Sequence, residues 1–377
     1  MVYDLAVVGA GICGLAHALA AARRGLKVIV LDRDAQANGA SIRNFGFITV
    51  TGQQQGECWR RAMRSRDVWA EIAAAADIPI LQRGLLVAAR RPEALAVLEA
   101  FAATEMGQDC TLLMPSQAAE RSPVLGPVEG ALLSPHELRV ESREAIPRLA
   151  AWLAEAHGVA FSYRTTVSGV EEGMLATSQG PVRAEAIAIC PGDDFGTLLP
   201  DRIAAYGLQR CKLHMMRLAA PSTPLPQPIM SDLGLVRYLG YAELPEAAAL
   251  RRRLETEQGE HLANGVHLIA VASGDGSLVV GDSHHYAATP DPFAPQHVDE
   301  LILDEFRAVL PGYADLPVIE RWIGTYASAD DRLALVDRPA DRIRLAIITS
   351  GTGASTSFAI AEEVIGELFG AQPSFGG

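Results

Sequence analysis

Residues 3–14 read Y-D-L-A-V-V-G-A-G-I-C-G, and this stretch decides the fold. Residues 3–8 are a run of β-favouring side chains, three glycines follow, and an Ala/Leu-rich segment continues from there to Arg24. This order predicts a buried strand, a glycine turn and a helix. Gly25 would end that helix, and the apolar residues 27–31 predict a second strand.

The three glycines have the G-x-G-x-x-G spacing of a dinucleotide-binding βαβ unit. Gly9 would permit the tight turn, Gly11 would let the backbone approach a pyrophosphate, and Gly14 would allow close packing of helix on strand. Asp32, directly after the second strand, would accept hydrogen bonds from a ribose diol, whereas its neighbour Arg33 could steady an adenine or a phosphate. The alternative is a glycine turn in any α/β protein, and the motif does not distinguish FAD from NAD.

A second glycine-rich turn lies near the other end of the chain. Residues 344–349 predict an apolar strand, S-G-T-G-A-S (350–355) follows, and a helix is expected from about residue 357 to residue 369. Exposed N–H groups of such a turn suit a developing anion, and a reduced flavin carries negative charge at its N1–C2=O edge. The alternative is an ordinary glycine turn before a C-terminal helix.

The remaining pattern predicts an α/β fold, α+β overall, with a Rossmann-like domain and a second domain built on an antiparallel sheet. Helices are expected at residues 56–76, 92–105 and 142–157, and strands at 84–89, 132–138, 186–190 and within 159–170. Further strands are expected at 212–218, 235–239, 266–272 and 277–280, and a charged helix or exposed excursion at 246–259. We assign residues 1–80, 140–208 and 325–377 to the dinucleotide-binding domain, and residues 81–139 and 209–324 to the second domain.

Bulk composition limits the partners of the chain. Of its 377 residues, 49% are hydrophobic and 20% charged, and the formal net charge of −13 repels nucleic-acid phosphates and anionic membranes. The sequence has no basic leader and no apolar span of about 18 residues, so we expect a soluble, cytoplasmic protein. Five widely spaced cysteines without a C-x-x-C pair fit a reducing compartment. We expect no nucleic-acid partner, no membrane partner, and a monomer or small homo-oligomer.

Five motifs together resemble the D-amino-acid oxidase (DAO) superfamily over nearly the whole chain. They are G-A-G-I-C-G (9–14), G-A-S-I-R-N-F-G-F (39–47), I-C-P-G-D (189–193), E-R-W-I-G-T-Y (320–326) and S-G-T-G-A-S-T-S-F (350–358). The chain looks closest to the glycine oxidase and sarcosine oxidase branch, and within it to FAD-dependent oxidoreductases associated with phosphonate breakdown. The resemblance implies that FAD lies extended through a discontinuous FAD-binding domain, under a substrate domain that covers the isoalloxazine ring.

The resemblance also implies which residues hold the cofactor. The matching positions are Gly9, Gly11, Gly14, Asp32, Ser41, Arg43, Asn44, Val167, Gly192, Gly351 and Gly353. Residues 41–44 would border the pyrophosphate and the flavin, and Val167 would contact the adenine half. Residues 352–356, among them Thr352, Ser355 and Thr356, would lie near the pyrimidine edge of the flavin.

Three departures from the family pattern bear on the chemistry. Tyr326 stands where amino-acid oxidases of this branch commonly have an arginine that binds the substrate carboxylate, so a simple α-amino acid is not the expected substrate. The sequence has no cysteine after Cys211, so FAD should be bound non-covalently. Val279 stands at the place of a lysine thought to assist oxygen reduction. Lys212, His284 or His285 could supply that positive charge instead.

In this family a neutral amine delivers the hydride of its α C–H to flavin N5, so positioning and electrostatics are the main tasks of the protein. The residues expected to face the flavin are Phe47, Lys212, His214, Tyr238, Tyr241, His284, His285, Tyr286 and Tyr326. Their cationic and hydroxyl donors suit an anionic head group such as phosphonate, although each could instead be an ordinary structural residue.

The prediction is therefore an FAD-dependent enzyme that oxidises CH–NH or CH–NH2 donors, with an aminophosphonate such as 2-aminoethylphosphonate or its N-methyl derivative as substrate. Oxygen is the expected electron acceptor. The alternatives are a glycine, sarcosine or D-amino-acid oxidase, an FAD dehydrogenase that uses a quinone or another carrier, and a structural flavoprotein. We expect no metal site, because His284 and His285 would point to opposite faces of a strand and no third ligand stands at a suitable spacing.

Overall fold

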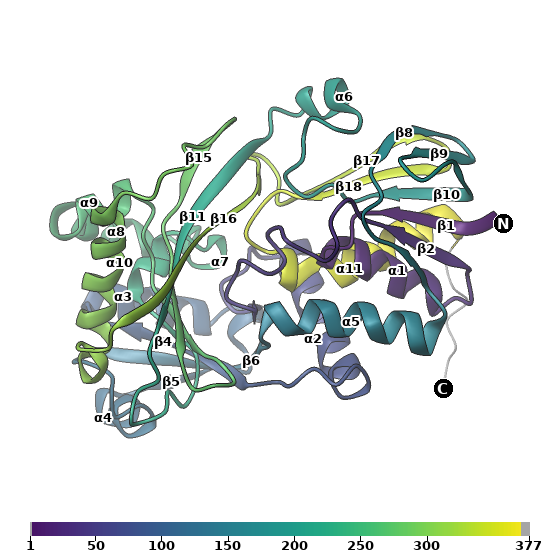
Figure 1. Cartoon of the computed structure of the whole chain (residues 1–377). Helices are drawn as coiled ribbons and strands as arrows, with labels where there is room; N and C mark the ends of the chain where they lie inside the picture. Colours follow the sequence, from purple (N-terminus) through teal and green to yellow (C-terminus); the bar gives the residue numbers. More distant parts are fainter. Residues whose placement is uncertain (1, 371–377) are drawn as a thin grey trace.

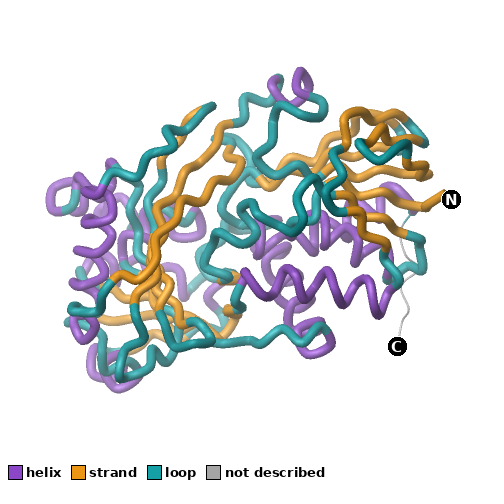
Figure 2. The backbone as a smooth tube through the Cα atoms, viewed as in Figure 1, coloured by secondary structure: helices purple, strands orange, loops and turns teal. Residues whose placement is uncertain are grey.

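The computed structural model describes residues 2–370, in which two large sheets lie side by side, each with helices against one face (Figure 1). One sheet contains the N-terminal strand and the other contains the long strands β11 and β16. Figure 2 shows that irregular loops gather between the two halves. Within these residues no helix is both long enough and apolar enough to cross a membrane.

The first sheet has eight strands, with the order β17-β18-β10-β1-β2-β7 and with β9 and β8 added beside β10. Its strands are β1 (Val2–Val8), β2 (Val28–Leu31), β7 (Ala160–Ser162), β8 (Val167–Glu171), β9 (Met174–Thr177), β10 (Val182–Ile189), β17 (Ala334–Ala340) and β18 (Ile343–Ile348). The five central strands, β18 to β7, are parallel to one another. Their carboxyl ends therefore meet at one edge, which is where open α/β sheets bind ligands.

Helices cover one face of this sheet, as the sequence predicted for a βαβ unit. The helices directly against it are α1 (Ile12–Ala22) and α11 (Gly353–Phe369). The helix α5 (Ser142–His157) packs on α1, and α2 (Glu57–Ala75) packs on α11. Leu5 and Val7 pack in the cluster with these helices, whereas Ala6 packs in a different cluster on the other face. This alternation is the period of two that a strand imposes on its side chains.

The second sheet has ten strands, with the order β15-β11-β14-β13-β12-β4-β6-β3, while β16 pairs with β11 and β5 with β6. Its strands are β3 (Phe47–Ile48), β4 (Gln82–Ala89), β5 (Thr111–Leu113), β6 (Gly130–Arg139), β11 (Gln209–Leu218), β12 (Ile229–Met230), β13 (Ile269–Ala272), β14 (Leu278–Gly281), β15 (His285–Ala287) and β16 (Val318–Ser328). All its pairs are antiparallel except that of β12 with β4. The predicted α/β fold with an antiparallel second sheet is thus confirmed.

Shorter helices surround the second sheet. They are α3 (Pro92–Ala102), α4 (Pro115–Arg121), α7 (Leu239–Ala242), α8 (Ala247–Glu257), α9 (Gly259–Ala263) and α10 (Gln296–Val309), with the 3₁₀ turns η1 (Glu105–Gly107), η2 (Asp232–Val236) and η3 (Pro311–Tyr313). A further short helix, α6 (Pro200–Ala204), precedes β11. The charged segment 246–259 was predicted to be either a helix or an exposed excursion, and it is largely helical.

Two predicted elements were wrong in detail. The strand expected at 235–239 is instead the end of η2 and the start of α7, because the N–H groups of Arg237 and Tyr238 both bond to the carbonyl of Gly234. A buried ion pair between Asp232 and Arg91, 3.0 Å long, fixes the start of that turn. The C-terminal helix begins at Gly353 rather than near residue 357, so its N-terminus lies inside the second glycine-rich turn.

The strand β16 connects the two sheets. It pairs with β11 over most of its length, from Leu218–Val318 to Gln209–Ser328. Just past its end, the N–H of Ala329 bonds to the carbonyl of Thr349, which follows β18 of the first sheet. The far end of the second sheet is thereby held against the carboxyl edge of the parallel sheet.

Candidate active site

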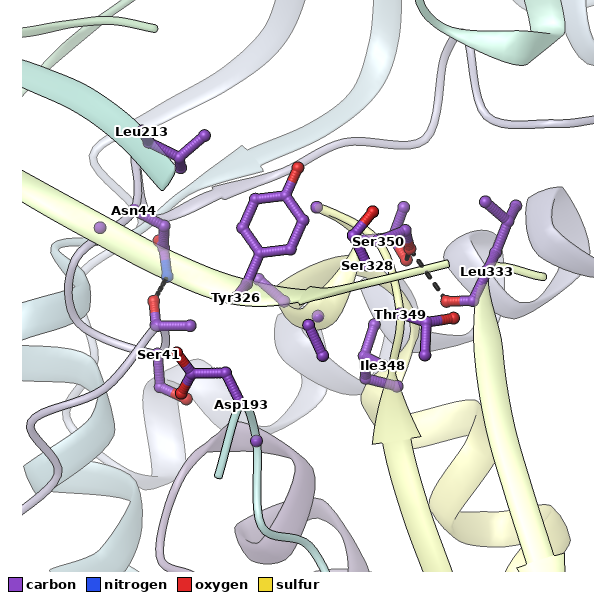
Figure 3. Close-up of a pocket in the computed structure, with 18 of the residues that line it drawn as sticks. Ser41, Asn44, Asp193, Leu213, Tyr326, Ser328, Leu333, Ile348, Thr349 and Ser350 are labelled. Carbon is purple, nitrogen blue, oxygen red and sulfur yellow. Dashed lines mark hydrogen bonds between the residues drawn. The ribbon is translucent and has the colours of Figure 1, made fainter. Parts of the chain in front are cut away.

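A cavity of about 400 Å³ lies between the two sheets, at the carboxyl ends of β1, β10 and β18. Both glycine-rich turns contribute to its wall, as do the loop 40–45 and the outer part of β16. Figure 3 shows Tyr326 of β16 between the loop that carries Ser41 and Asn44 and the turn that carries Ser350. The two glycine turns that the sequence singled out therefore open on one cavity.

The first glycine turn has no room for side chains. Gly9 has φ +104°, which L-residues rarely adopt, and a Cβ there would lie 2.3 Å from the carbonyl oxygen of Cys190. A Cβ on Gly14 would lie 1.8 Å from the carbonyl oxygen of Gly9. These contacts hold the N-terminus of α1, whose N-cap is Gly11, at the edge of the cavity. A helix N-terminus in this position favours a phosphate.

Asp32 lies behind this turn and does not itself line the cavity. One of its carboxylate oxygens accepts a hydrogen bond from Ala10 N at 2.7 Å, and the other accepts one from Asp34 N at 2.9 Å. Arg33 is exposed and forms an ion pair with Asp194 at 2.5 Å. Val167 is buried at the start of β8, also outside the cavity. The predicted ribose and adenine contacts of these residues remain predictions.

The loop after Asp32 borders the cavity through Ser41, Arg43 and Asn44. Ser41 Oγ accepts a hydrogen bond from Ile12 N at 2.9 Å, so the loop is tied to the first turn of α1. Asn44 closes the loop on itself, with Nδ2 donating to Ala40 O at 2.7 Å and Oδ1 accepting from Gly46 N at 2.6 Å. Trp322 Nε1 of β16 donates to Arg43 O at 3.1 Å, which joins this loop to the second sheet.

The second glycine turn closes the opposite wall. Gly351, Thr352 and Gly353 line the cavity, and Thr352 is the N-cap of α11. Ser355 and Thr356 lie in the first turn of that helix, buried and outside the cavity. Ser355 Oγ accepts a hydrogen bond from Thr49 N at 2.9 Å, and Thr356 Oγ1 donates to Thr352 O at 3.0 Å. Gly192, at the end of β10, also lines the cavity, with φ +64°.

These groups fit an extended dinucleotide. The N-termini of two helices, α1 and α11, face one cavity, and each supplies backbone N–H groups and a positive dipole end. In the first turn, any side chain in place of Gly9 or Gly14 would collide with backbone atoms. The fold therefore requires glycine at both positions for the turn to pack closely against β10 and α1. The structure thus brings eight predicted cofactor residues to the cavity wall: Gly11, Ser41, Arg43, Asn44, Gly192, Gly351, Thr352 and Gly353.

The other end of the cavity is lined by polar side chains of the second sheet. Arg237 and Tyr238 come from the η2–α7 connection, Tyr286 from β15 and Tyr326 from β16. Arg237 Nη2 donates to the Tyr286 hydroxyl at 2.7 Å. Among residues 2–370, no carboxylate forms an ion pair with Arg237. A permanently charged guanidinium thus faces the cavity without an anionic partner.

Three further ionisable groups lie beside Arg237. Asp282 Oδ1 is 3.1 Å from His267 Nδ1 and 3.8 Å from His284 Nδ1, and all three residues are buried in the cavity wall. Burial raises the pKa of Asp282 to about 8, although the charge of Arg237 opposes this shift. Burial, reinforced by Arg237, lowers the pKa of both His267 and His284 well below the usual value. The two imidazoles are therefore neutral at pH 7.

The structure divides the predicted catalytic residues into two groups. Phe47, Tyr238, His284 and Tyr326 line the cavity, together with Tyr286. Residues that do not line it are Lys212, His214, Tyr241 and His285.

The second group has protein partners elsewhere. Lys212 Nζ donates to the carbonyls of Asp291 and Phe293, at 2.9 and 2.8 Å. His214 Nδ1 lies 2.8 Å from Asp299 Oδ1, and Tyr241 is fully buried in the core of the second half. Lys212 of β11 is paired with His285 of β15, and neither residue lines the cavity.

Sequence reasoning missed Arg237, His267 and Asp282. Arg237 lay inside the strand predicted at 235–239, where only its neighbour Tyr238 was named as a candidate. His267 lay inside the strand predicted at 266–272, and no motif marked it. Sequence spacing showed no third ligand beside His284 and His285, whereas the fold brings His267 and Asp282 close to His284. Strand alternation correctly predicted that His284 and His285 point to opposite faces, and His284 alone of the two lines the cavity. Alternation carries no information about the groups from other segments that meet His284.

Comparisons with known proteins agree with this geometry. The family model described as FAD dependent oxidoreductase (DAO) matches residues 4–366. A component protein of the opine oxidase of Rhizobium meliloti is 23% identical over 354 residues, which are 89% of this chain and 85% of that protein. Glycine oxidase from Geobacillus kaustophilus superposes with a TM-score of 0.79 at 19% identity, over 100% of this chain and 96% of the other. L-proline dehydrogenase from P. horikoshii gives a TM-score of 0.79 at 18% identity, over 98% and 94%.

Proposed function

The chain belongs to the DAO family of FAD-dependent oxidoreductases, and on this premise we propose that it oxidises a small amine with an anionic head group. Our preferred substrate is 2-aminoethylphosphonate or its N-methyl derivative. FAD is the cofactor, and when bound it supplies flavin N5 as acceptor of the hydride from the carbon beside the amine nitrogen. Hydrolysis of the resulting imine would release an aldehyde or keto compound together with ammonia or a primary amine.

The observation that carries this proposal is the guanidinium of Arg237, which faces the cavity and has no carboxylate partner in the described part of the chain. Because a half-buried cation without a counter-ion is costly, an anionic ligand group at this place would stabilise the site. Arginine presents parallel N–H donors that match phosphonate or carboxylate oxygens. The Tyr286 hydroxyl, 2.7 Å from Arg237 Nη2, would contact a further oxygen of the same head group.

This arginine comes from a different segment than the family resemblance suggested. Tyr326 occupies the place of the usual carboxylate-binding arginine, and Arg237 approaches the cavity from the η2–α7 connection. A relocated cation supports a substrate whose anionic group lies at another distance from the amine than in a simple α-amino acid. Structures of a glycine oxidase and an L-proline dehydrogenase share the fold. An amino-acid substrate is therefore the alternative proposal.

For the cofactor, we assign the pyrophosphate to the turn at residues 9–14 and the loop at 41–44, and the flavin edge to residues 351–353. Asp32 would hold the ribose of the adenine half. Its position behind the first glycine turn, where it bonds to Ala10 N, supports this assignment. The FAD-binding domain would comprise residues 1–80, 140–208 and 325–377, and the substrate domain residues 81–139 and 209–324. No cysteine follows Cys211, which supports non-covalent binding.

A panel of amines tests the proposal directly. The holoenzyme is mixed anaerobically with 2-aminoethylphosphonate, its N-methyl derivative, glycine, sarcosine, proline and D-alanine, and loss of the flavin absorbance is followed. We expect the aminophosphonates to reduce the flavin fastest. Fast reduction by glycine alone would overturn the choice of substrate, and a protein that stays colourless in the presence of FAD would overturn the function.

Oxygen is our proposed electron acceptor. Stoichiometric hydrogen peroxide on aerobic turnover would support it. Turnover that needs a quinone or another carrier and releases no peroxide would instead identify a dehydrogenase. A yellow protein that no amine reduces would identify a structural flavoprotein.

A further inference from the structure

A cluster of three buried polar side chains in the cavity wall has no task in the account so far. His267 precedes β13, and Asp282 and His284 belong to the segment between β14 and β15. Their exposed fractions are 2%, 4% and 8% respectively. These three residues are distant from Arg237 in the sequence, and the fold brings all four to the wall of one cavity.

The hydrogen-bonding capacity of this cluster is largely unused. Within the described part of the chain, both ring nitrogens of His267 and the Oδ1 atom of Asp282 have no hydrogen-bond partner. His284 Nδ1 bonds to the carbonyl of Gly265 at 2.9 Å, so that nitrogen carries the proton and Nε2 is left as an acceptor. Buried polar groups are normally hydrogen-bonded, and such exceptions point to a missing ligand or a proton-transfer role.

The charges of the cavity wall point to a particular kind of ligand group. Within residues 2–370, Arg237 has no carboxylate within ion-pair distance. The basic groups within that distance of Asp282 are the imidazoles of His267 and His284, which are neutral. A zwitterion that carries an anion and an ammonium would satisfy both side chains at once. The anionic end of the substrate was assigned above to Arg237, which leaves Asp282 for the ammonium end.

We propose that Asp282, supported by His267, accepts the proton that the ammonium of the substrate must lose before its carbon can give up a hydride. This inference rests on the proposed function. The N–H bond of the ammonium breaks, its electron pair stays on nitrogen, and the proton moves to a carboxylate oxygen of Asp282. His267 Nδ1, 3.1 Å from Asp282 Oδ1, then accepts a hydrogen bond from the protonated carboxyl. No electrons are transferred in this step.

The protonation states agree with this role and give it a pH dependence. The pKa of Asp282 is raised to about 8, chiefly by burial, so Asp282 is protonated below that pH and cannot take a second proton. Above it the carboxylate is free to accept one. The ionisable groups facing Asp282 and His267 from the surrounding elements are Arg237, Tyr238, His284, Tyr286 and Tyr326. Of these, only Arg237 is charged at pH 8, because burial keeps the tyrosines and His284 neutral.

A cation site made by the same three side chains is the less favoured interpretation. Their ligand atoms lie within 4.8 Å of one another, but the charge of Arg237 would repel a metal ion. His284 Nδ1 is also occupied by the carbonyl of Gly265. Metal content of the purified holoenzyme is therefore measured as part of the test.

The kinetic test is the limiting rate of flavin reduction at saturating aminophosphonate, measured anaerobically as a function of pH. We expect this rate in the wild type to rise up to a plateau, with an apparent pKa near 8 set by Asp282. Asp282→Asn should abolish this rise and lower the plateau rate by about 100-fold or more. His267→Gln should lower the rate by a smaller factor and shift the apparent pKa. Using the N-methyl substrate should leave the apparent pKa in place, because it belongs to the enzyme.

A matched control uses a second buried histidine–carboxylate pair, His214 with Asp299, which lies outside the cavity. Asp299→Asn makes the same chemical change as Asp282→Asn and should retain the rise of the rate with pH. Infrared difference spectra of the substrate-free holoenzyme provide a readout besides activity. A carbonyl band of a protonated carboxylic acid should vanish with a midpoint near pH 8 in the wild type and be absent in Asp282→Asn.

The outcomes separate the two proposals. If no amine reduces the wild-type flavin, the proposed function fails, and the infrared titration alone then decides whether Asp282 holds the expected proton. If the wild type is reduced but Asp282→Asn keeps both its rate and its pH profile, only the proton-acceptor role is overturned. A stoichiometric metal that is lost in Asp282→Asn would also overturn it.

Discussion

The two ends of the cavity differ in how their polar groups are satisfied. At the cofactor end, Asp32, Ser41 and Asn44 all bond to backbone groups of their own neighbourhood. At the end proposed for the substrate, Arg237 and Asp282 have no ion-pair partner of opposite charge among the residues that the structure describes. The first end is thus a rigid frame that the protein completes by itself, whereas the second depends on a ligand to complete its hydrogen bonds. Preorganisation at one end and unfilled capacity at the other suit a resident cofactor and a passing substrate.

The largest effect should come from breaking the frame. Gly14→Ala puts a Cβ 1.8 Å from the carbonyl oxygen of Gly9, so α1 must move away from β1 and the pyrophosphate loses its place. We expect a protein that is purified without FAD and is colourless. The ratio of flavin to protein absorbance measures this.

Gly366→Ala is the matched control for that change. It adds the same methyl group inside helix α11, where nothing lies within 4 Å of the new Cβ. Full FAD content is expected, with a slight gain in stability because alanine favours helix. A yellow Gly14→Ala protein with normal FAD affinity would contradict the role of the first turn.

The next effect concerns the substrate end. Arg237→Met removes the guanidinium and keeps much of its apolar bulk, so it should lower kcat/KM for an anionic amine by about 100-fold, mainly through KM. FAD content should be unchanged, because Arg237 does not touch the first glycine turn. Steady-state kinetics and flavin absorbance separate the two. Arg307→Met, at an exposed position on α10, serves as the control, and equal losses in both variants would disprove anion binding by Arg237.

Asp32→Asn tests whether the cofactor end is as self-contained as its hydrogen bonds suggest. The amide oxygen can keep the bond to Ala10 N, now 2.7 Å, so the turn should survive. The amide nitrogen cannot accept the bond that Asp34 N donates at 2.9 Å in the wild type, and the negative charge that would face the ribose is removed. We therefore expect FAD affinity to fall by about tenfold. Fluorescence titration of the apoprotein with FAD gives this value. Complete loss of FAD binding would show instead that Asp32 holds the turn itself.

The smallest effect is a dependence of stability on pH. The pKa of Asp282 is raised in the folded protein from 3.8 to about 8, so folding favours the protonated form. The stability that this provides is fully present below pH 4 and is lost as the pH rises to about 8. Asp282→Asn cannot ionise, so at pH 9 its Tm should exceed that of the wild type by about 3 °C. This difference in Tm should disappear as the pH approaches 4. An equal difference at pH 9 and pH 4 would contradict the raised pKa of Asp282.

The sequence alone determined the frame of this protein. The strand at β1, the glycine turn, α1 and the acid at Asp32 follow from local spacing, because a tight turn and close helix packing exclude side chains at particular positions. The second turn was likewise visible in residues 350–355, although α11 begins within it. The α/β class and the antiparallel second sheet followed from hydrophobic periodicity.

Only the tertiary structure decided which side chains line the cavity. Lys212 and His285 are paired across β11 and β15 and do not line the cavity, whereas His284 does. Strand alternation separates His284 from His285, but it does not tell which face of the strand borders the cavity. Arg237, His267 and Asp282 come from three separate segments, and no local pattern encodes their meeting. Their proximity results from the packing of the second sheet against the carboxyl ends of the first, which is a long-range property of the fold.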